Sequence, residues 1–278
     1  MRSLELAVKY LAGDRLIGTA AERAALTTAL ISGSAGWDIN AQQATSAGFL
    51  NWFAQADEPN TDGRAIYDLG VGNEIDGDFV IRFKGTFDDK SSTAGRFFFW
   101  VSETDNAKAI NGEDALVLDF HDDLQIRTLA TDSAQGFAHS GSKVGSFSTG
   151  NTYYFEFKRD GTTLTGQVFT ASDFSTGASS VTSLTLGSGF QGGRDYRYVG
   201  FKSTGGGWDW TANGSYQAWD FDDIVIYDNQ TSATTATYTF NFSDIPAVYP
   251  NLPNGAIFEE SDTGKHYMFD GTSTWNEM

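Results

Sequence analysis

The strongest constraint on the fold is a two-residue alternation of apolar and polar side chains. In residues 78–87 one face carries Phe79, Ile81, Phe83 and Phe87, and the other carries Val80, Arg82, Lys84 and Thr86. Residues 153–158 repeat the pattern, and the turn dipeptide Asp160-Gly161 follows them. Because neighbouring side chains of a strand point to opposite faces, this period predicts strands with one buried face, joined here by a hairpin.

Similar runs recur along most of the chain at a spacing of about 8–12 residues, which is typical of a sandwich or barrel. The composition agrees, because 22 Phe, 11 Tyr and 7 Trp among 278 residues suit pleated, half-buried surfaces. Residues 97–101 are continuously apolar, as expected for a strand inside two packed sheets. We therefore expect an all-β fold, a sandwich of two antiparallel sheets.

Both ends of the chain differ from this body. Leu4, Val8 and Leu11 have the spacing of one helical face, and Thr19 with Glu22 forms a capping box before an expected helix at residues 20–31. This predicts a short N-terminal helical arm, residues 1–33, whose apolar stripe docks either on a larger assembly or on its own β domain. Charged residues interrupt the first fifteen positions, so we expect no signal peptide there.

Three prolines close together, at 246, 250 and 253, indicate a boundary near the C-terminus. Beyond them, residues 256–261 and 265–269 flank Asp262-Thr263-Gly264 and predict a hairpin. We therefore divide the chain into the arm (1–33), the sandwich (34–229) and a small C-terminal β-hairpin module (230–278).

Charge and composition exclude several classes of function. The chain has 18 Lys and Arg against 36 Asp and Glu, so its net charge is 18 − 36 = −18. Nucleic acid is excluded as a partner because neutralising phosphate requires a basic surface. No apolar run approaches the ~20 residues that membrane insertion needs. The chain has no cysteine, which excludes thiolate metal sites and a cysteine nucleophile.

Three segments of the body resemble the concanavalin A-like lectin/glucanase (LamG-type) jelly rolls. They are residues 65–70, 78–87 and 219–227, the last containing Asp222-Asp223-Ile224-Val225-Ile226-Tyr227. The resemblance covers roughly residues 36–229 and implies a jelly-roll β-sandwich. It leaves the function open, because this fold is found in lectins, glycosidases, receptor modules and virion proteins.

Residues 252–275 resemble a C-terminal module of structural proteins from tailed phages and marine or archaeal viruses, and residues 11–26 are similar to the openings of such proteins. The resemblance implies a virion structural protein, for example a capsid decoration, tail or fibre component. Its expected partners are other virion proteins, bound through residues 1–33, and further copies of the same chain. A host cell-surface glycan is an additional expected ligand.

A glycine-rich segment supplies the candidate carbohydrate site. Its residues are Trp208, Asp209, Trp210, Asn213 and Tyr216. Indole rings stack on the apolar faces of sugars, while carboxylate and amide groups bond their hydroxyls. The alternative is that both tryptophans pack against the sandwich or a neighbouring subunit.

Calcium is the candidate cofactor, because carboxylate and amide oxygens with loop spacing are its preferred ligands. The candidate ligands are Asp57, Asn60 and Asp62 in one segment and Asp220 with Asp222 in another. The alternative is that these are solvated acids that keep the protein soluble.

Catalysis has one sequence candidate. Glu74, Asp76 and Asp78 partly match the Glu-x-Asp-x-Glu strand of glucanases with this fold, but Asp76-Gly77 is a turn signal and the third position is shorter. We therefore expect a protein that is not an enzyme. The alternatives are a soluble or secreted lectin module and, third, a glycoside hydrolase.

Overall fold

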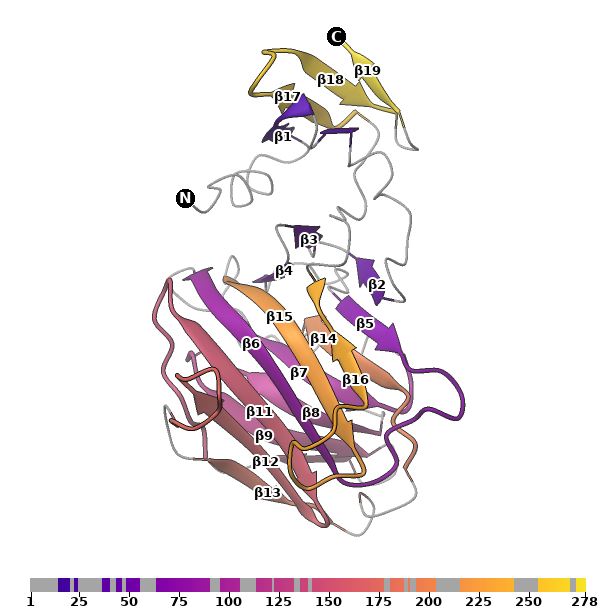
Figure 1. Ribbon diagram of the computed structural model, residues 1–278, viewed down its shortest axis with the longest axis vertical. Helices are drawn as coiled ribbons and strands as arrows, with labels where there is room; N and C mark the ends of the chain where they lie inside the picture. The colour runs from indigo at the N-terminus through magenta and orange to yellow at the C-terminus, as the bar shows by residue number, and fades with distance from the viewer. Residues whose placement is uncertain are drawn as a thin grey trace.

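The computed structural model describes residues 15–20, 23–24, 37–40, 44–46, 49–55, 64–90, 96–105, 114–121, 123–132, 136–139, 142–177, 181–187, 190, 194–203, 216–242, 255–270 and 274–278. Within these residues the chain is almost entirely β structure, and two large sheets pack face to face (Figure 1). A third, smaller sheet is formed by strands from the N-terminal and C-terminal regions of the chain. The expected all-β sandwich of two antiparallel sheets is confirmed.

One large sheet has seven strands in the order β10-β9-β8-β7-β14-β5-β2, all paired antiparallel. In chain order its strands are β2 (Trp37–Asn40), β5 (Arg64–Asp68), β7 (Phe97–Ser102), β8 (Ala115–Phe120), β9 (Ile126–Asp132), β10 (Gly136–His139) and β14 (Tyr198–Ser203).

The other large sheet has eight strands, of which seven follow the order β13-β12-β11-β6-β15-β4-β3 and the eighth, β16, pairs with β15. Its strands are β3 (Ala44–Ser46), β4 (Phe49–Gln55), β6 (Phe79–Lys90), β11 (Thr152–Asp160), β12 (Thr163–Phe169), β13 (Thr182–Thr185), β15 (Tyr216–Asp228) and β16 (Tyr238–Phe240). The predicted hairpin at Asp160-Gly161 joins β11 to β12, and Gly161 has the positive φ of 56° that such a turn requires.

The core between the sheets is built from the alternating residues of the sequence pattern. Phe79, Ile81 and Phe83 of β6 are at most 1% exposed, as are Phe155 and Phe157 of β11. Phe83 lies at the centre of this cluster. Its ring centroid is 4.6 Å from Phe99, 5.1 Å from Phe155, 5.7 Å from Phe201 and 5.9 Å from Phe221.

The continuous apolar run 97–101 has a different cause, since both faces of β7 are buried. Phe97, Phe99 and Val101 belong to the central core. Phe98 and Trp100 point to the outer side, where they form a second buried cluster with Ile66, Ala115, Val117 and Leu129. The alternation signal is therefore absent where a strand is covered on both sides.

Strand β15 is interrupted by register shifts, one at Ala218/Trp219 and one between Asp222 and Val225. Asp223 lies in the second irregularity with φ of 53°. A β-bulge of this kind bends the strand and redirects side chains. It brings two consecutive carboxylates, Asp222 and Asp223, toward the same lysine, Lys84.

The small sheet combines both ends of the chain, in the order β1-β17-β18-β19. Strand β1 (Arg15–Gly18) pairs parallel to β17 (Ile257–Glu260), and β18 (His266–Phe269) and β19 (Trp275–Glu277) follow antiparallel. The predicted hairpin of residues 256–269 is thus present. Strand β1 was not expected, because the sequence predicted this segment as part of a helical arm.

A helical turn begins directly after β1. Residues 20, 23 and 24 are helical, and the Arg23 N–H donates to the Thr19 carbonyl at 3.0 Å. The helix start predicted at Thr19 agrees with this turn, and the other residues of the arm lie outside the described part. The boundaries at 33/34 and 229/230 stay predictions. The structure adds that β1 joins the C-terminal module, whereas β16 pairs with the sandwich strand β15.

Candidate functional site

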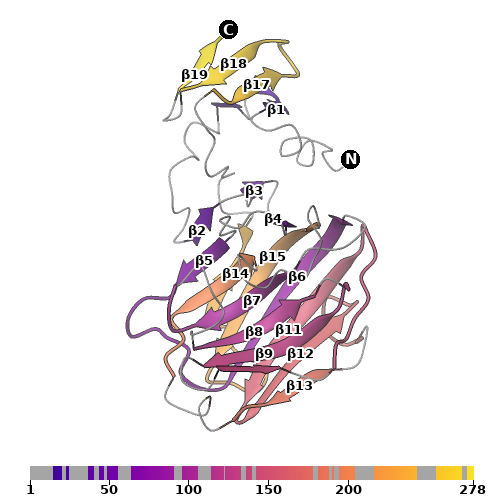
Figure 2. The ribbon, with the colours of Figure 1, turned by 180° about the vertical axis from the view of Figure 1, so that it is seen from behind.

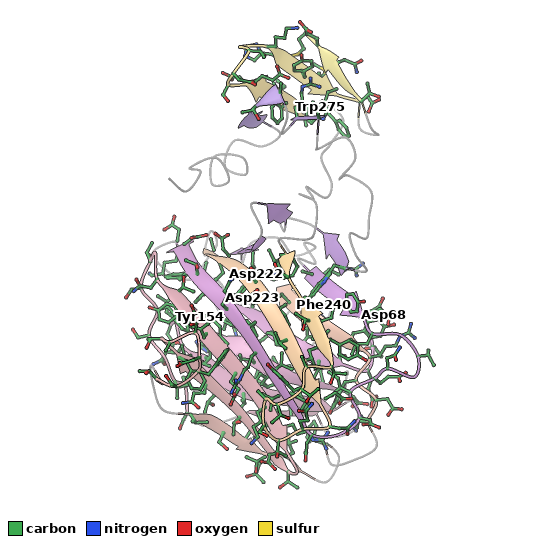
Figure 3. All side chains as sticks on the ribbon, in the orientation of Figure 1. Asp68, Tyr154, Asp222, Asp223, Phe240 and Trp275 are labelled. Atoms are coloured by element: carbon green, nitrogen blue, oxygen red, sulfur yellow. The ribbon has the colours of Figure 1, made fainter. Side chains whose placement is uncertain are left out.

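The outer face of the eight-stranded sheet carries a ladder of polar side chains from three adjacent strands. Register places Lys84 of β6 between Tyr154 of β11 and Asp222 of β15. Arg82 lies opposite Glu156 one step along the sheet. Figure 3 shows Tyr154, Asp222 and Asp223 on this face. We call it the Tyr154 face, defined by Arg82, Lys84, Tyr154, Glu156, Asp222, Asp223 and Phe174.

Ion pairs organise the charges of the Tyr154 face. The Arg82 Nε donates to Glu156 Oε2 at 2.8 Å, and Lys84 Nζ lies 3.1 Å from Asp222 Oδ2 and 2.6 Å from Asp223 Oδ2. Burial lowers the pKa of Lys84, but the hydrogen bonds and charges of Asp223 and Asp222 outweigh it, so its pKa is raised. The lysine therefore stays charged at neutral pH.

The aromatic residue Phe174 lies at one side of the Tyr154 face. Phe174 follows β12, in a loop where Thr170 N–H donates to the Thr176 carbonyl at 3.0 Å. Its ring centroid is 5.9 Å from that of Tyr154, at an interplanar angle of 71°, and the Arg82 guanidinium carbon is 4.2 Å from its centre. Both rings are partly exposed.

The backbone of Phe174 is strained, with φ of 59°. A left-handed conformation costs a non-glycine residue roughly 1–2 kcal/mol. Strain of this kind is concentrated at functional sites, where the surrounding structure holds it in place. Phe174 was not among the residues predicted from the sequence, although a single aromatic residue within the polar stretch 170–177 was a usable signal.

The predicted carbohydrate residues Trp208, Asp209, Trp210 and Asn213 lie outside the described residues. Tyr216 is the first residue of β15, where it pairs with Gln55. The glycan prediction for this segment therefore stays a prediction.

The predicted calcium ligands Asp57, Asn60 and Asp62 also lie outside the described residues. Asp222 has another role, because its Oδ1 accepts the Phe242 N–H at 2.9 Å and its Oδ2 pairs with Lys84. Asp220 is two residues earlier on β15 and partly buried. Within the described part of the chain, no group of three or more His, Asp or Glu side chains is placed to hold a metal ion.

The outer face of the seven-stranded sheet, which faces the viewer in Figure 2, carries a buried charge cluster. Asp119 accepts from Arg96 Nε and Nη2, both at 2.7 Å, and from Arg127 Nε at 2.7 Å. Lys202 Nζ lies 4.7 Å from the centre of the Trp100 ring. Trp100 is 1% exposed and Lys202 is 2% exposed, so the Trp100 ring is not accessible to a ligand in this structure.

A pair of acids lies where β7 leads toward β8. The Glu103 N–H donates to the Asp114 carbonyl at 3.1 Å, and Arg194 pairs with both side chains. Burial raises the pKa of Glu103, and a side-chain hydrogen bond with Asp114 raises it further. A raised carboxyl pKa is a property of general acids.

The Glu-x-Asp motif does not form the strand face that glucanase chemistry requires. Strand β6 begins at Phe79, after the motif. Glu74 Oε2 accepts the Gly72 N–H at 2.7 Å, and Asp78 Oδ1 accepts the Gly161 N–H at 2.6 Å. These two carboxylates hold turns in place.

No protein-family model matches the chain, and no curated protein does. Solved structures of similar fold exist. An alginate lyase from Klebsiella pneumoniae has 12% identity and a TM-score of 0.42, over 70% of this chain and 85% of that one. A winged bean acidic lectin has 14% identity and a TM-score of 0.42, over 69% and 94%. The CBM2 module of an evolved Dit protein from Lactobacillus casei BL23 phage J-1 has 12% identity and a TM-score of 0.39, over 70% and 83%.

At these identities the likeness concerns the fold alone, a jelly-roll sandwich of antiparallel sheets. It corrects one expectation, namely that the chain is not an enzyme. That expectation is wrong as it stands, because the similar sandwiches include several family 7 alginate lyases. Among the described residues, no helix has the length and apolar character needed to cross a membrane.

Proposed function

We propose that the sandwich binds carbohydrate and that the Tyr154 face is its binding surface. The observation that supports the proposal is the pair of partly exposed rings, Tyr154 and Phe174, which lie beside two ion pairs on the outer face of the eight-stranded sheet. Sites for small polar ligands combine a few aromatic side chains with precisely placed polar groups in this way.

The rings and the charges have complementary roles toward a sugar. The C–H face of a pyranose packs on an aromatic ring, and the tyrosine hydroxyl adds a polar group at the edge. Arg82 and Lys84 supply hydrogen-bond donors, while Glu156 and Asp223 supply acceptors for hydroxyl groups. Asp223 is exposed and has the positive φ of the β15 bulge, so its carboxylate is accessible from solvent.

The test is a glycan array followed by calorimetric titration of the strongest ligand. Phe174→Ala removes one ring and its contact with Arg82, and we expect about tenfold weaker binding, which corresponds to about 1.4 kcal/mol. Tyr154→Phe keeps the ring and should retain most of the affinity. Val71→Ala is the matched control, because Val71 is 79% exposed and makes no described contact with the residues of the Tyr154 face.

The same titration separates the two proposed glycan surfaces. Trp210→Ala tests the segment from Trp208 to Tyr216, which stays a proposal of its own. If Trp210→Ala abolishes binding while Phe174→Ala leaves it intact, the ligand belongs to that segment and the Tyr154 face should be abandoned. Absence of any glycan signal for the wild type would contradict both.

We also propose that the chain is a structural component of a virion. Support comes from the resemblance of residues 252–275 and 11–26 to viral structural proteins. Antibody labelling of purified particles in electron micrographs, with mass spectrometry of the same particles, tests this. Particles that lack the chain would contradict the proposal.

Cleavage of a polysaccharide is the second candidate function, favoured by the acid pair Glu103 and Asp114 next to Arg194, in which the pKa of Glu103 is raised. A carboxyl with a raised pKa can donate a proton to a leaving sugar oxygen. We expect size-exclusion chromatography to show shortening of one member of a panel of neutral and acidic polysaccharides, lost in Glu103→Gln and partly kept in Glu103→Asp. If the wild type shortens no polysaccharide, this candidate fails, whereas the binding proposal is tested separately.

A further inference from the structure

We propose that the C-terminal module is a receptor for the N-terminal segment, residues 15–24, of a second copy of this chain. The exchange would link neighbouring copies through strand β1. This interaction goes beyond glycan binding and does not depend on it. The proposal rests on the detailed fit between two segments that are far apart in the sequence.

The backbone contact is a parallel strand pairing. Arg15, Leu16, Ile17 and Gly18 are in register with the four residues of β17, from Ile257 to Glu260. The helical turn that follows is also held, because Asp262 Oδ1 accepts the Ala20 N–H at 3.0 Å. A carboxylate at the first turn of a helix satisfies an otherwise unpaired N–H and interacts favourably with the helix dipole.

The side-chain contact centres on Arg23. Its Nε donates to Glu260 Oε1 at 2.7 Å, and its guanidinium carbon lies 3.6 Å from the centre of the Tyr267 ring. The Glu260 side chain is only 1% exposed. Hydrogen bonding from Thr263 and the charge of Arg23 lower the pKa of Glu260, so the buried acid is ionised.

This arrangement makes the module dependent on the segment. A buried carboxylate that loses its cation is left with an uncompensated charge, which strongly destabilises the surrounding structure. The module has a small core of its own, formed by Phe258, Phe269 and Trp275. In the structure, the arginine that pairs with Glu260 comes from the same chain, and Arg23 of a second copy could make the same contact.

Two features favour donation between copies. Strands β17, β18 and β19 pair with no described strand of either large sheet, so strand pairing does not tie the small sheet to its own sandwich. Residues 25–36 separate the segment from β2, and an extended chain of that length reaches about 40 Å. Exchange of an identical element between copies preserves every contact and is a low-cost route to oligomers. The apolar stripe of residues 1–33 likewise indicates a docking element.

A charge exchange distinguishes donation within one chain from donation between chains. Arg23→Glu and Glu260→Arg each place like charges together when the segment docks on its own module. Coexpressed with different affinity tags, the two variants satisfy both contacts only by docking on each other. We expect capture of one tag to recover at least tenfold more partner chain from the complementary pair than from two differently tagged copies of either single variant.

A disulfide provides a second readout that does not depend on the stability of the variants. Ile17 and Glu259 are register partners, and the chain has no cysteine of its own. Register partners on neighbouring strands lie within the Cα separation that a disulfide needs. Chains carrying Ile17→Cys are coexpressed with chains carrying Glu259→Cys, and the product is separated on a non-reducing gel.

A covalent heterodimer forms only when β1 of one chain pairs with β17 of another. Chains with Ile17→Cys alone are the control for random cross-linking. We expect heterodimer to exceed that control at least tenfold. If both experiments show no association between chains, while a single chain carrying Ile17→Cys and Glu259→Cys forms its internal disulfide quantitatively, the pairing is confined to one chain and the proposal is overturned.

Discussion

Replacing Phe83 by alanine tests the packing of the sandwich at its centre. The side chain is 1% exposed and lies among rings of both sheets. Truncation of a buried phenylalanine costs about 3–5 kcal/mol, the sum of lost burial and the cavity left behind. The space at Phe83 is bounded on both sides by hydrogen-bonded strands that cannot collapse into it. We therefore expect the upper half of this range, about 4–5 kcal/mol.

Urea denaturation followed by tryptophan fluorescence measures this loss, and heating provides a second measure. For a sandwich of this size, each kcal/mol lowers the melting temperature by about 2–4 °C. The expected loss therefore corresponds to a decrease of roughly 8–20 °C. Phe83→Leu should cost clearly less, because it fills most of the space. A loss below about 2 kcal/mol for Phe83→Ala, with an unchanged dependence on urea, would refute the assignment of Phe83 to the centre of a rigid core.

Three further perturbations test other parts of the structure. Gly85→Ala would place a Cβ 2.6 Å from Phe221 Cε1, so we expect a loss of about 1–3 kcal/mol in the same urea assay, and an unchanged midpoint would contradict the packing described. The pKa of Glu103 is raised in the folded state above its ordinary value of 4.5, so the stability of the wild type should fall as the pH rises from that value through the folded pKa. Glu103→Gln should flatten this slope in melting curves recorded between pH 4 and pH 7. Lys84→Met leaves Asp222 without its cation and should cost about 1–2 kcal/mol, most of which Asp222→Asn in the same chain should restore if the ion pair is the cause.

Local sequence signals predicted those parts of the fold that depend on neighbouring residues. The alternation in residues 78–87 indicates a strand with one apolar face, and the inward side of β6 carries the core phenylalanines. Turn dipeptides likewise indicated the β11–β12 and β17–β18 hairpins. In both cases, side-chain direction and turn conformation are properties of a few consecutive residues.

The candidate site was less accessible to sequence reasoning. Of the residues predicted to bind calcium, Asp222 is placed by the β15 bulge against Lys84 and the Phe242 amide. Phe174 belongs to the Tyr154 face only because its loop folds back over β11, and no period or spacing in the sequence contains that contact. Expectations about ligands that rest on spacing alone therefore miss the neighbours that decide what a side chain does.

The sequence by itself determined the class of the fold, because a period of two along many short segments is compatible only with sheets that bury one face. Only the tertiary structure decided which strands become neighbours. Strand β1 pairs with β17 although Arg15 and Ile257 are separated by nearly the whole chain. Such pairing depends on the closure of a long loop and on contacts such as Arg23 with Glu260, and these exist only once distant segments have met.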